Sequence, residues 1–180
     1  MSVLSIVLII IVVLLAIVFI GAASLSKEYT IARSTTINRP LQQVFDYVKL
    51  LNNQDHYNKW VMTDPQARKT LRGVDGTPGA IYTWDSDNKQ MGKGEQEIKG
   101  IAEGKSIDQE MRFEKPFKAT SWVRLTTTSV TTTQTNVEYS FGGTRNFGMK
   151  VAHFLFNLSK ALGKDVEISL QNLKNVLESK

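Results

Sequence analysis

The segment FGMKVAHFLFNLSKALGKDVEISLQNLKNVL, residues 147–177, decides the fold of this chain. Apolar side chains recur in it at steps of three and four residues: Val151, Leu155, Leu158, Leu162, Val166, Leu170, Leu173 and Leu177. Such spacing puts one apolar stripe on a single helix face. We therefore predict one helix of roughly 30 residues, about 45 Å long, which would cross a whole small domain.

The chain before this helix predicts a sheet for the helix to cover. Strands are expected over residues 29–37, 67–72, 80–85, 91–102, 107–114, 120–128 and 134–142, from their alternation and β-forming residues. An amphipathic helix is expected after Pro40, with a short polar helical turn over residues 52–60. The simplest way to bury both apolar faces is a curved antiparallel sheet laid along the last helix.

The N-terminus predicts a membrane span. No charged residue occurs from Val3 to Ala23, and about 20 apolar residues suffice to cross a bilayer as a helix. A cleaved signal peptide is the alternative, with a possible cleavage stretch at Ala22-Ala23-Ser24, but it predicts a basic start and a shorter apolar run. We expect residues 1–26 to form a transmembrane anchor and linker and residues 27–180 to form one domain.

Charge suggests which side of the membrane the domain faces. Lys27, Arg33 and Arg39 follow the span against one nearby acid, Glu28, which favours a cytoplasmic domain. The net charge of +5 is spread along the chain without a basic stripe or reader motif, so we expect no nucleic-acid partner. The locally basic span of residues 59–72 is either an ordinary solvated surface or a surface for anionic headgroups.

Several short motifs, in this order, resemble the START/polyketide-cyclase (SRPBCC) superfamily. They are RSTTINRP (33–40) leading into Val44-Phe45, Trp60, GAIYTW (79–84), GKG (92–94) followed by Ile98, FEKP (113–116), TNVEY (135–139) and LQNLK (170–174). The resemblance covers residues 29–178 and implies an α+β helix-grip fold. The anchor ahead of the domain is similar to the membrane-tethered bacterial branch of these proteins.

The resemblance also implies an apolar cavity between sheet and helix that holds a lipid or another hydrophobic small molecule. Candidate lining residues are Tyr82, Trp84, Met111, Phe113, Trp122, Tyr139 and Phe141 on strands, with Phe154, Leu155 and Leu158 on the helix. An inward Arg124 would bind a ligand carboxylate or phosphate, and His153 would donate a hydrogen bond at the wall. The alternative is that the aromatic residues fill a dry core and that Arg124 and His153 face solvent.

Residues for catalysis are sparse. The two histidines, His56 and His153, are far apart in sequence, no Ser-His-Asp arrangement is evident, and the absence of cysteine excludes disulfides and thiolate metal sites. We therefore expect no catalytic residue, metal or cofactor. Three hypotheses remain: a membrane-tethered ligand-binding module, a cyclase- or dehydrase-like enzyme with His153 or Glu95 as acid or base, and a partner protein with a filled core.

Overall fold

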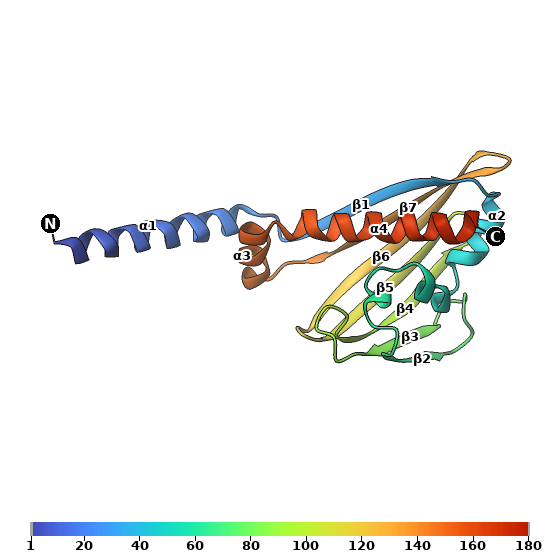
Figure 1. The fold of residues 1–180 in the computed structure, drawn as a ribbon, viewed down its shortest axis with the longest axis horizontal. Helices are drawn as coiled ribbons and strands as arrows, with labels where there is room; N and C mark the ends of the chain where they lie inside the picture. The colour runs from blue at the N-terminus through green and yellow to red at the C-terminus, as the bar shows by residue number, and fades with distance from the viewer. Residues whose placement is uncertain (1, 180) are drawn as a thin grey trace.

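A computed structural model describes residues 2–179 of the protein (Figure 1). The elements in chain order are α1 (Val3–Ser24), β1 (Glu28–Ile37), α2 (Leu41–Val48), the 3-10 helices η1 (Leu51–His56) and η2 (Val61–Thr63), β2 (Arg68–Arg72), β3 (Ile81–Asp85), β4 (Lys93–Ala102), β5 (Ser106–Lys115), β6 (Ala119–Thr131), β7 (Gln134–Thr144), α3 (Phe147–Phe156) and α4 (Leu158–Glu178).

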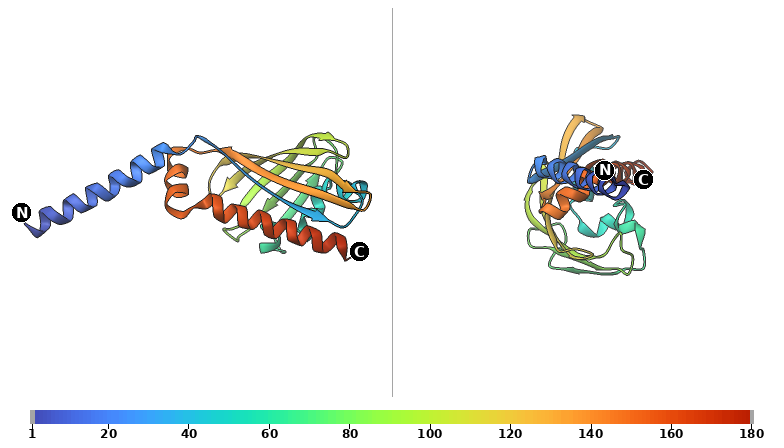
Figure 2. Two further views of the ribbon diagram at one scale, coloured as in Figure 1. Left: turned by 90° about the horizontal axis from the view of Figure 1, so that it is seen from above. Right: turned by 90° about the vertical axis from the view of Figure 1, so that its left-hand side faces the viewer.

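The strands form one seven-stranded antiparallel sheet in the order β1-β7-β6-β5-β4-β3-β2. The sheet curves around α4, as the two views of Figure 2 show. The predicted α+β fold, a curved antiparallel sheet around a C-terminal helix after an apolar N-terminal helix, is therefore confirmed. The pairing of β4 with β5 has two register shifts, one between Lys93 and Gly94 and one before Gly100.

The end of the domain at α2 is densely packed. Val166, Leu170, Leu173 and Leu177 of α4 are at most 3% exposed. They belong to the same buried cluster as Ile37 of β1 and Val44, Phe45 and Val48 of α2. This cluster confirms the predicted apolar stripe over residues 166–177 and the amphipathic helix predicted after Pro40, whose buried face consists of these three α2 residues.

The prediction of one continuous helix over residues 147–177 is wrong. Asn157 has φ 46° and ψ 49°, the left-handed conformation, and it separates α3 from α4. Asparagine visits this region more readily than most residues because its short polar side chain tolerates it. The stepwise apolar pattern continues through Asn157, so hydrophobic periodicity alone did not reveal the break.

Helix α1 projects from the domain, and α3 crosses its last turns (Figures 1 and 2). Among residues 2–179, α1 is the one helix long and apolar enough to cross a membrane, by length and composition. Its apolar side chains from Val3 to Leu15 are each at least 46% exposed, so no described part of the protein covers this portion of the helix.

Candidate functional site

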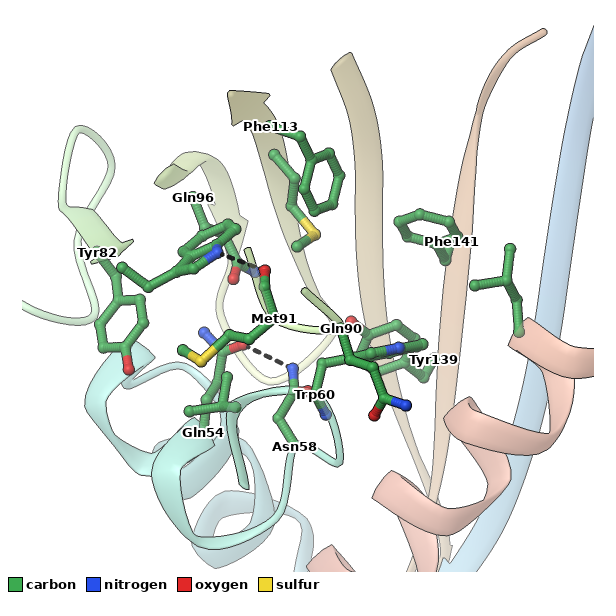
Figure 3. Close-up of a pocket in the computed structure, with 14 residues that line it drawn as sticks. Gln54, Asn58, Trp60, Tyr82, Gln90, Met91, Gln96, Phe113, Tyr139 and Phe141 are labelled. Carbon is green, nitrogen blue, oxygen red and sulfur yellow. Dashed lines mark hydrogen bonds between the residues drawn. The ribbon is translucent and has the colours of Figure 1, made fainter. Parts of the chain in front are cut away.

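A cavity of about 210 Å³ lies between the concave face of the sheet, the η1–η2 segment and the start of α4 (Figure 3). Fourteen residues line it: Gln54, Asn58, Trp60, Val61, Tyr82, Trp84, Gln90, Met91, Gln96, Met111, Phe113, Tyr139, Phe141 and Leu162. The interior is therefore densely packed beside α2 and the C-terminal half of α4, and it is hollow beside the first turns of α4.

The aromatic side chains of this cavity support one another. The rings of Trp84 and Phe113 meet edge to face with centroids 5.9 Å apart, and the rings of Tyr82 and Trp84 are 6.5 Å apart. Trp84 also donates a hydrogen bond from Nε1 to the carbonyl oxygen of Met91 at 3.1 Å. Paired aromatic rings add packing energy beyond simple burial, so this wall is well held in place.

The polar groups of the cavity are amides and hydroxyls. Gln54 is 4% exposed, and its Oε1 accepts a hydrogen bond from Asn58 Nδ2 at 3.0 Å. Its Nε2 is buried and has no hydrogen-bond partner among the residues that the structure describes. Gln96 donates from Nε2 to Gln109 Oε1 at 2.5 Å, which fixes the opposite wall. A buried donor without an acceptor carries a desolvation cost, which a ligand oxygen or nitrogen would remove.

The cavity is electrically neutral. None of the fourteen described lining residues has a side chain that is charged at neutral pH. Burial raises the pKa of Tyr139, and burial together with the hydrogen bond from Tyr82 Oη to Asp55 Oδ1, at 2.6 Å, raises the pKa of Tyr82. Both phenols therefore stay protonated, and the cavity offers hydrogen bonds without a fixed charge for a carboxylate or phosphate.

Six of the predicted lining residues do line the cavity: Tyr82, Trp84, Met111, Phe113, Tyr139 and Phe141. Trp122 and Arg124 lie on the opposite face of the sheet, because Ser121, Val123 and Leu125 of β6 take the buried positions. The Trp122 ring covers Gly142 of the neighbouring strand, where a Cβ would lie 2.4 Å from its Cζ2 atom. Arg124 forms an ion pair with Asp108 on this outer face instead of pointing into the cavity.

The helix residues predicted for the lining lie elsewhere as well, because α3 turns away at Asn157. His153 is buried against the ring of Tyr29, Phe154 packs on Gly21 of α1, and Leu155 is 51% exposed. Leu158, at the first position of α4, is half-buried and is not among the lining residues, whereas Leu162 one turn later is.

Sequence reasoning missed eight lining residues: Gln54, Asn58, Trp60, Val61, Gln90, Met91, Gln96 and Leu162. Two of them had a usable signal, since Leu162 belongs to the helical stripe and Gln96 shares a strand face with Ile98. The others come from η1, η2, the segment that joins them and the β3–β4 loop, where no periodicity identifies the inward side chain.

The acidic and basic candidates pair with one another outside the cavity. Glu95 binds Arg72 and Arg112, and His56 Nδ1 lies 3.2 Å from the hydroxyl of Tyr47. In the basic span of residues 59–72, the cations form ion pairs: Lys59–Asp165, Arg68–Asp85, Lys69–Asp55 and Arg72–Glu95. Within residues 2–179, no three His, Asp or Glu side chains come together in a way that could hold a metal ion.

Solved structures share this fold. No family model and no curated protein sequence matches the chain. A protein from Mesorhizobium loti superposes with a TM-score of 0.61 and 14% identity over 84% of this chain and 98% of its own. Ara h 8.0201 gives 0.60 and 11% over 85% and 99%, and DynU16, from the dynemicin biosynthetic locus, gives 0.56 and 14% over 83% and 47%.

These neighbours include Bet v1-like and polyketide-cyclase-type folds. Their sequence identities to this chain lie between 11% and 14%, so the likeness concerns the fold alone. It agrees with the helix-grip architecture that the sequence motifs imply.

Proposed function

We propose that this protein is a membrane-anchored binding module for a small, uncharged, largely apolar molecule, and that it holds this ligand in the cavity beneath α4 without transforming it. The observation that carries the proposal is the aromatic, neutral cavity inside an otherwise close-packed sheet and helix. Ligand sites are typically apolar with a few placed polar groups, and this lining has that composition.

The size of the cavity limits the ligand. A cavity of about 150 Å³ is enough for a benzene-sized guest. At about 210 Å³ the present cavity has room for a slightly larger compact molecule. A two-chain phospholipid exceeds this volume severalfold. Among the lipids and hydrophobic molecules that the fold suggests, we therefore favour a fused-ring or short-chain compound.

The unpaired Nε2 of Gln54 specifies the ligand further. We infer that the ligand carries a hydrogen-bond acceptor, such as a ketone or ether oxygen, which this amide meets. A neutral acceptor suits the site better than a carboxylate, because no cation lies among the described lining residues.

A matched pair of fluorescent ligands tests this chemistry on the full chain in detergent. 2-Acetylnaphthalene and 2-ethylnaphthalene have similar shapes but differ in the carbonyl group. We expect the ketone to bind roughly tenfold more tightly, and Gln54→Leu to abolish that preference. Equal affinity of the wild type for both compounds would show that Gln54 does not select an acceptor.

A second variant pair tests the cavity itself. Leu162→Trp would fill it, whereas Ile168→Trp adds the same bulk on α4 at a residue that does not line it. We expect the first to abolish binding of both naphthalenes and the second to preserve it. Native mass spectrometry of the protein purified from cells would identify a retained ligand. A binding-competent Leu162→Trp variant would contradict the assignment of this cavity.

A cyclase- or dehydrase-like activity is supported less well. Its candidate acid and base, Glu95 and His153, lie outside the cavity, and the lining hydroxyls of Tyr82 and Tyr139 have raised pKa values.

The anchoring part of the proposal rests on α1, and a cytoplasmic domain is favoured by Lys27, Arg33 and Arg39 after the span. A reporter fused to the C-terminus of the protein would test that orientation, through its accessibility to protease added outside intact cells.

A further inference from the structure

Helix α3 presents one face to α1. The ring centroids of Phe147 and Phe19 are 5.0 Å apart. The ring of Phe154 lies on Gly21, where a Cβ would come within 2.4 Å of two ring carbons. Glycine at position 21 therefore allows a close helix crossing, which in both ribbon figures runs across α1 instead of along it (Figures 1 and 2).

A second face of α3 is fixed to the domain. The ring of His153 is 5.2 Å from that of Tyr29, and His153 Nδ1 is 3.2 Å from Ser159 Oγ. The guanidinium of Arg145 lies over the ring of Tyr29, 4.7 Å from its centroid, and donates hydrogen bonds to the carbonyl oxygens of Ser26 and Glu28. The end of α1, the start of β1 and α3 are thus tied together by one network.

The remaining face of α3 is apolar and uncovered. Leu155 is 51% exposed and Phe156 is 71% exposed, and Phe147 and Phe154 keep 47% and 41% of their surface open at the edges of the α1 contact. Single exposed apolar residues are ordinary, but four on one ten-residue helix are a concentration of exposed apolar surface of the kind that marks an interaction site.

The position of α3 along α1 indicates what covers this patch. A 22-residue helix is about 33 Å long, close to the roughly 30 Å of the bilayer core. From Phe19, where α3 crosses, to the end at Ser24 the helix rises about 7.5 Å. Interfacial helices bury their apolar face about 5–10 Å into the boundary between headgroups and acyl chains, which is this depth.

We propose that α3 is an interfacial helix whose Leu155–Phe156 face docks into the bilayer beside α1, so that the domain sits on the membrane in one fixed orientation. The docking rests on the proposed anchoring by α1, and its occupant is a lipid surface with anionic headgroups. Exposed lysines on the linker and on the first turns of α4, namely Lys27, Lys160 and Lys164, supply the charge complementarity.

The β5–β6 loop forms a second contact of the same docking surface. Antiparallel pairing brings the loop, residues 116–118, to the end of the sheet where β1 begins and β7 ends (Figure 1). At its tip Phe117 is 80% exposed and stands between Lys115 and Lys118, which are also exposed. Since Phe113 of β5 lines the cavity, docking brings that cavity wall close to the lipid surface.

Single-cysteine labelling of the full chain tests this docking, because the sequence has no native cysteine. A nitrobenzoxadiazole label is placed at Phe156→Cys, at Phe117→Cys, at Val13→Cys in the middle of α1, and at Asn175→Cys near the far end of α4. The protein is reconstituted in nanodiscs of phosphatidylcholine and phosphatidylglycerol with spin-labelled lipid, the spin label being either near the headgroup or deep in the acyl chain.

We expect the spin label near the headgroup to quench the fluorescence most at position 156, and the spin label deep in the acyl chain to quench it most at position 13. Neither should quench the label at position 175. Position 117 should be quenched in these nanodiscs and much less in phosphatidylcholine alone. If position 13 is quenched and 156 behaves like 175, the docking is wrong and the anchor stands. If position 13 itself is unquenched, the anchoring is wrong and the docking with it. Blue-shifted but unquenched emission at 156 would show that a protein surface, such as a second copy, covers α3 and would overturn the proposal.

Discussion

Helices α3 and α4 come from one apolar stretch of sequence, yet different surroundings cover them. The apolar residues of α4 between Val166 and Leu177 that face the sheet are at most 3% exposed, whereas four apolar residues of α3 are 41–71% exposed. Helix α4 alternates this stripe with Lys, Asp, Glu and Gln residues, while α3 has only Lys150 and His153 among its ten residues as polar side chains. The higher apolar content of α3 and its scarcity of charged residues separate the two helices.

This difference is consistent with water around the outer face of α4 and lipid around the open face of α3. A helix with one apolar stripe and a charged back fits between a protein core and water. A helix that is apolar nearly all round needs cover on every side, and α3 has protein on two of its faces. In our proposal lipid covers the third.

The largest effect is expected from truncating one apolar side chain in each helix. Leu173→Ala empties a fully buried position, and we expect it to lower the free energy of unfolding by about 3 kcal/mol. Phe156→Ala truncates a side chain that touches little protein, and we expect a change within about 0.5 kcal/mol in detergent. Chemical denaturation followed by tryptophan fluorescence measures both. Equal losses would mean that protein contacts hold α3 as firmly as they hold α4.

The next test targets the Arg145 network that ties the end of α1 and the start of β1 to α3. Arg145→Met removes the hydrogen bonds to the carbonyl oxygens of Ser26 and Glu28 and the cation above Tyr29. We expect a loss of about 2 kcal/mol, the scale for hydrogen bonds from a charged group. Hydrogen exchange should accelerate at the amides of residues 26–30. Arg124→Met is the control, because Arg124 has one exposed ion pair with Asp108, and such pairs contribute little.

Most of the fold was accessible from the sequence because periodicity reports burial. The alternation of Ile107, Gln109, Met111 and Phe113 predicts the inward face of β5, and the three- and four-residue steps predict the buried side of α4. The break at Asn157 was not accessible, since asparagine in the left-handed conformation leaves the apolar spacing on either side intact. Because the tertiary contact with α1 decides where α3 points, local sequence cannot reveal it.

The cavity was accessible only in part. Strand parity places Tyr82, Trp84, Tyr139 and Phe141 toward α4, and the structure lines the cavity with them. Trp122 was expected inside because it is aromatic, although the parity of β6 sends it outward to cover Gly142. Gln54 lies in η1, and neither the hydrogen bond that its Oε1 accepts from Asn58 nor its unpaired Nε2 could be predicted from sequence spacing.

A smaller effect is expected at the hinge between the two helices. Asn157→Val places a β-branched residue at φ 46°, which we expect to cost about 1–2 kcal/mol. Because Asn157 is exposed, this loss would come from the backbone and not from burial. Asn157→Gly is the matched control and should be tolerated. Circular dichroism during thermal unfolding distinguishes the two, and an unchanged melting temperature in Asn157→Val would indicate that α3 and α4 can join into one straight helix.

The smallest effect is a pH dependence at the α3–domain contact. Burial, and then the positive charge of Arg145, lower the pKa of His153 below its ordinary value of 6.5. The unfolded chain therefore binds more protons than the folded one as the pH falls below this value, so stability rises with pH in this window. The stabilisation by neutral His153 is fully present above about pH 6.5 and is lost as the pH drops toward the folded-state pKa.

As the pH is lowered from about 7 to about 5, the melting temperature should therefore fall more steeply for the wild type than for His153→Gln, which has no titrating ring. Parallel profiles for the two proteins would mean that His153 is as accessible to protons in the folded protein as in the unfolded chain, and that the contact between α3 and Tyr29 is looser than that between α4 and the sheet.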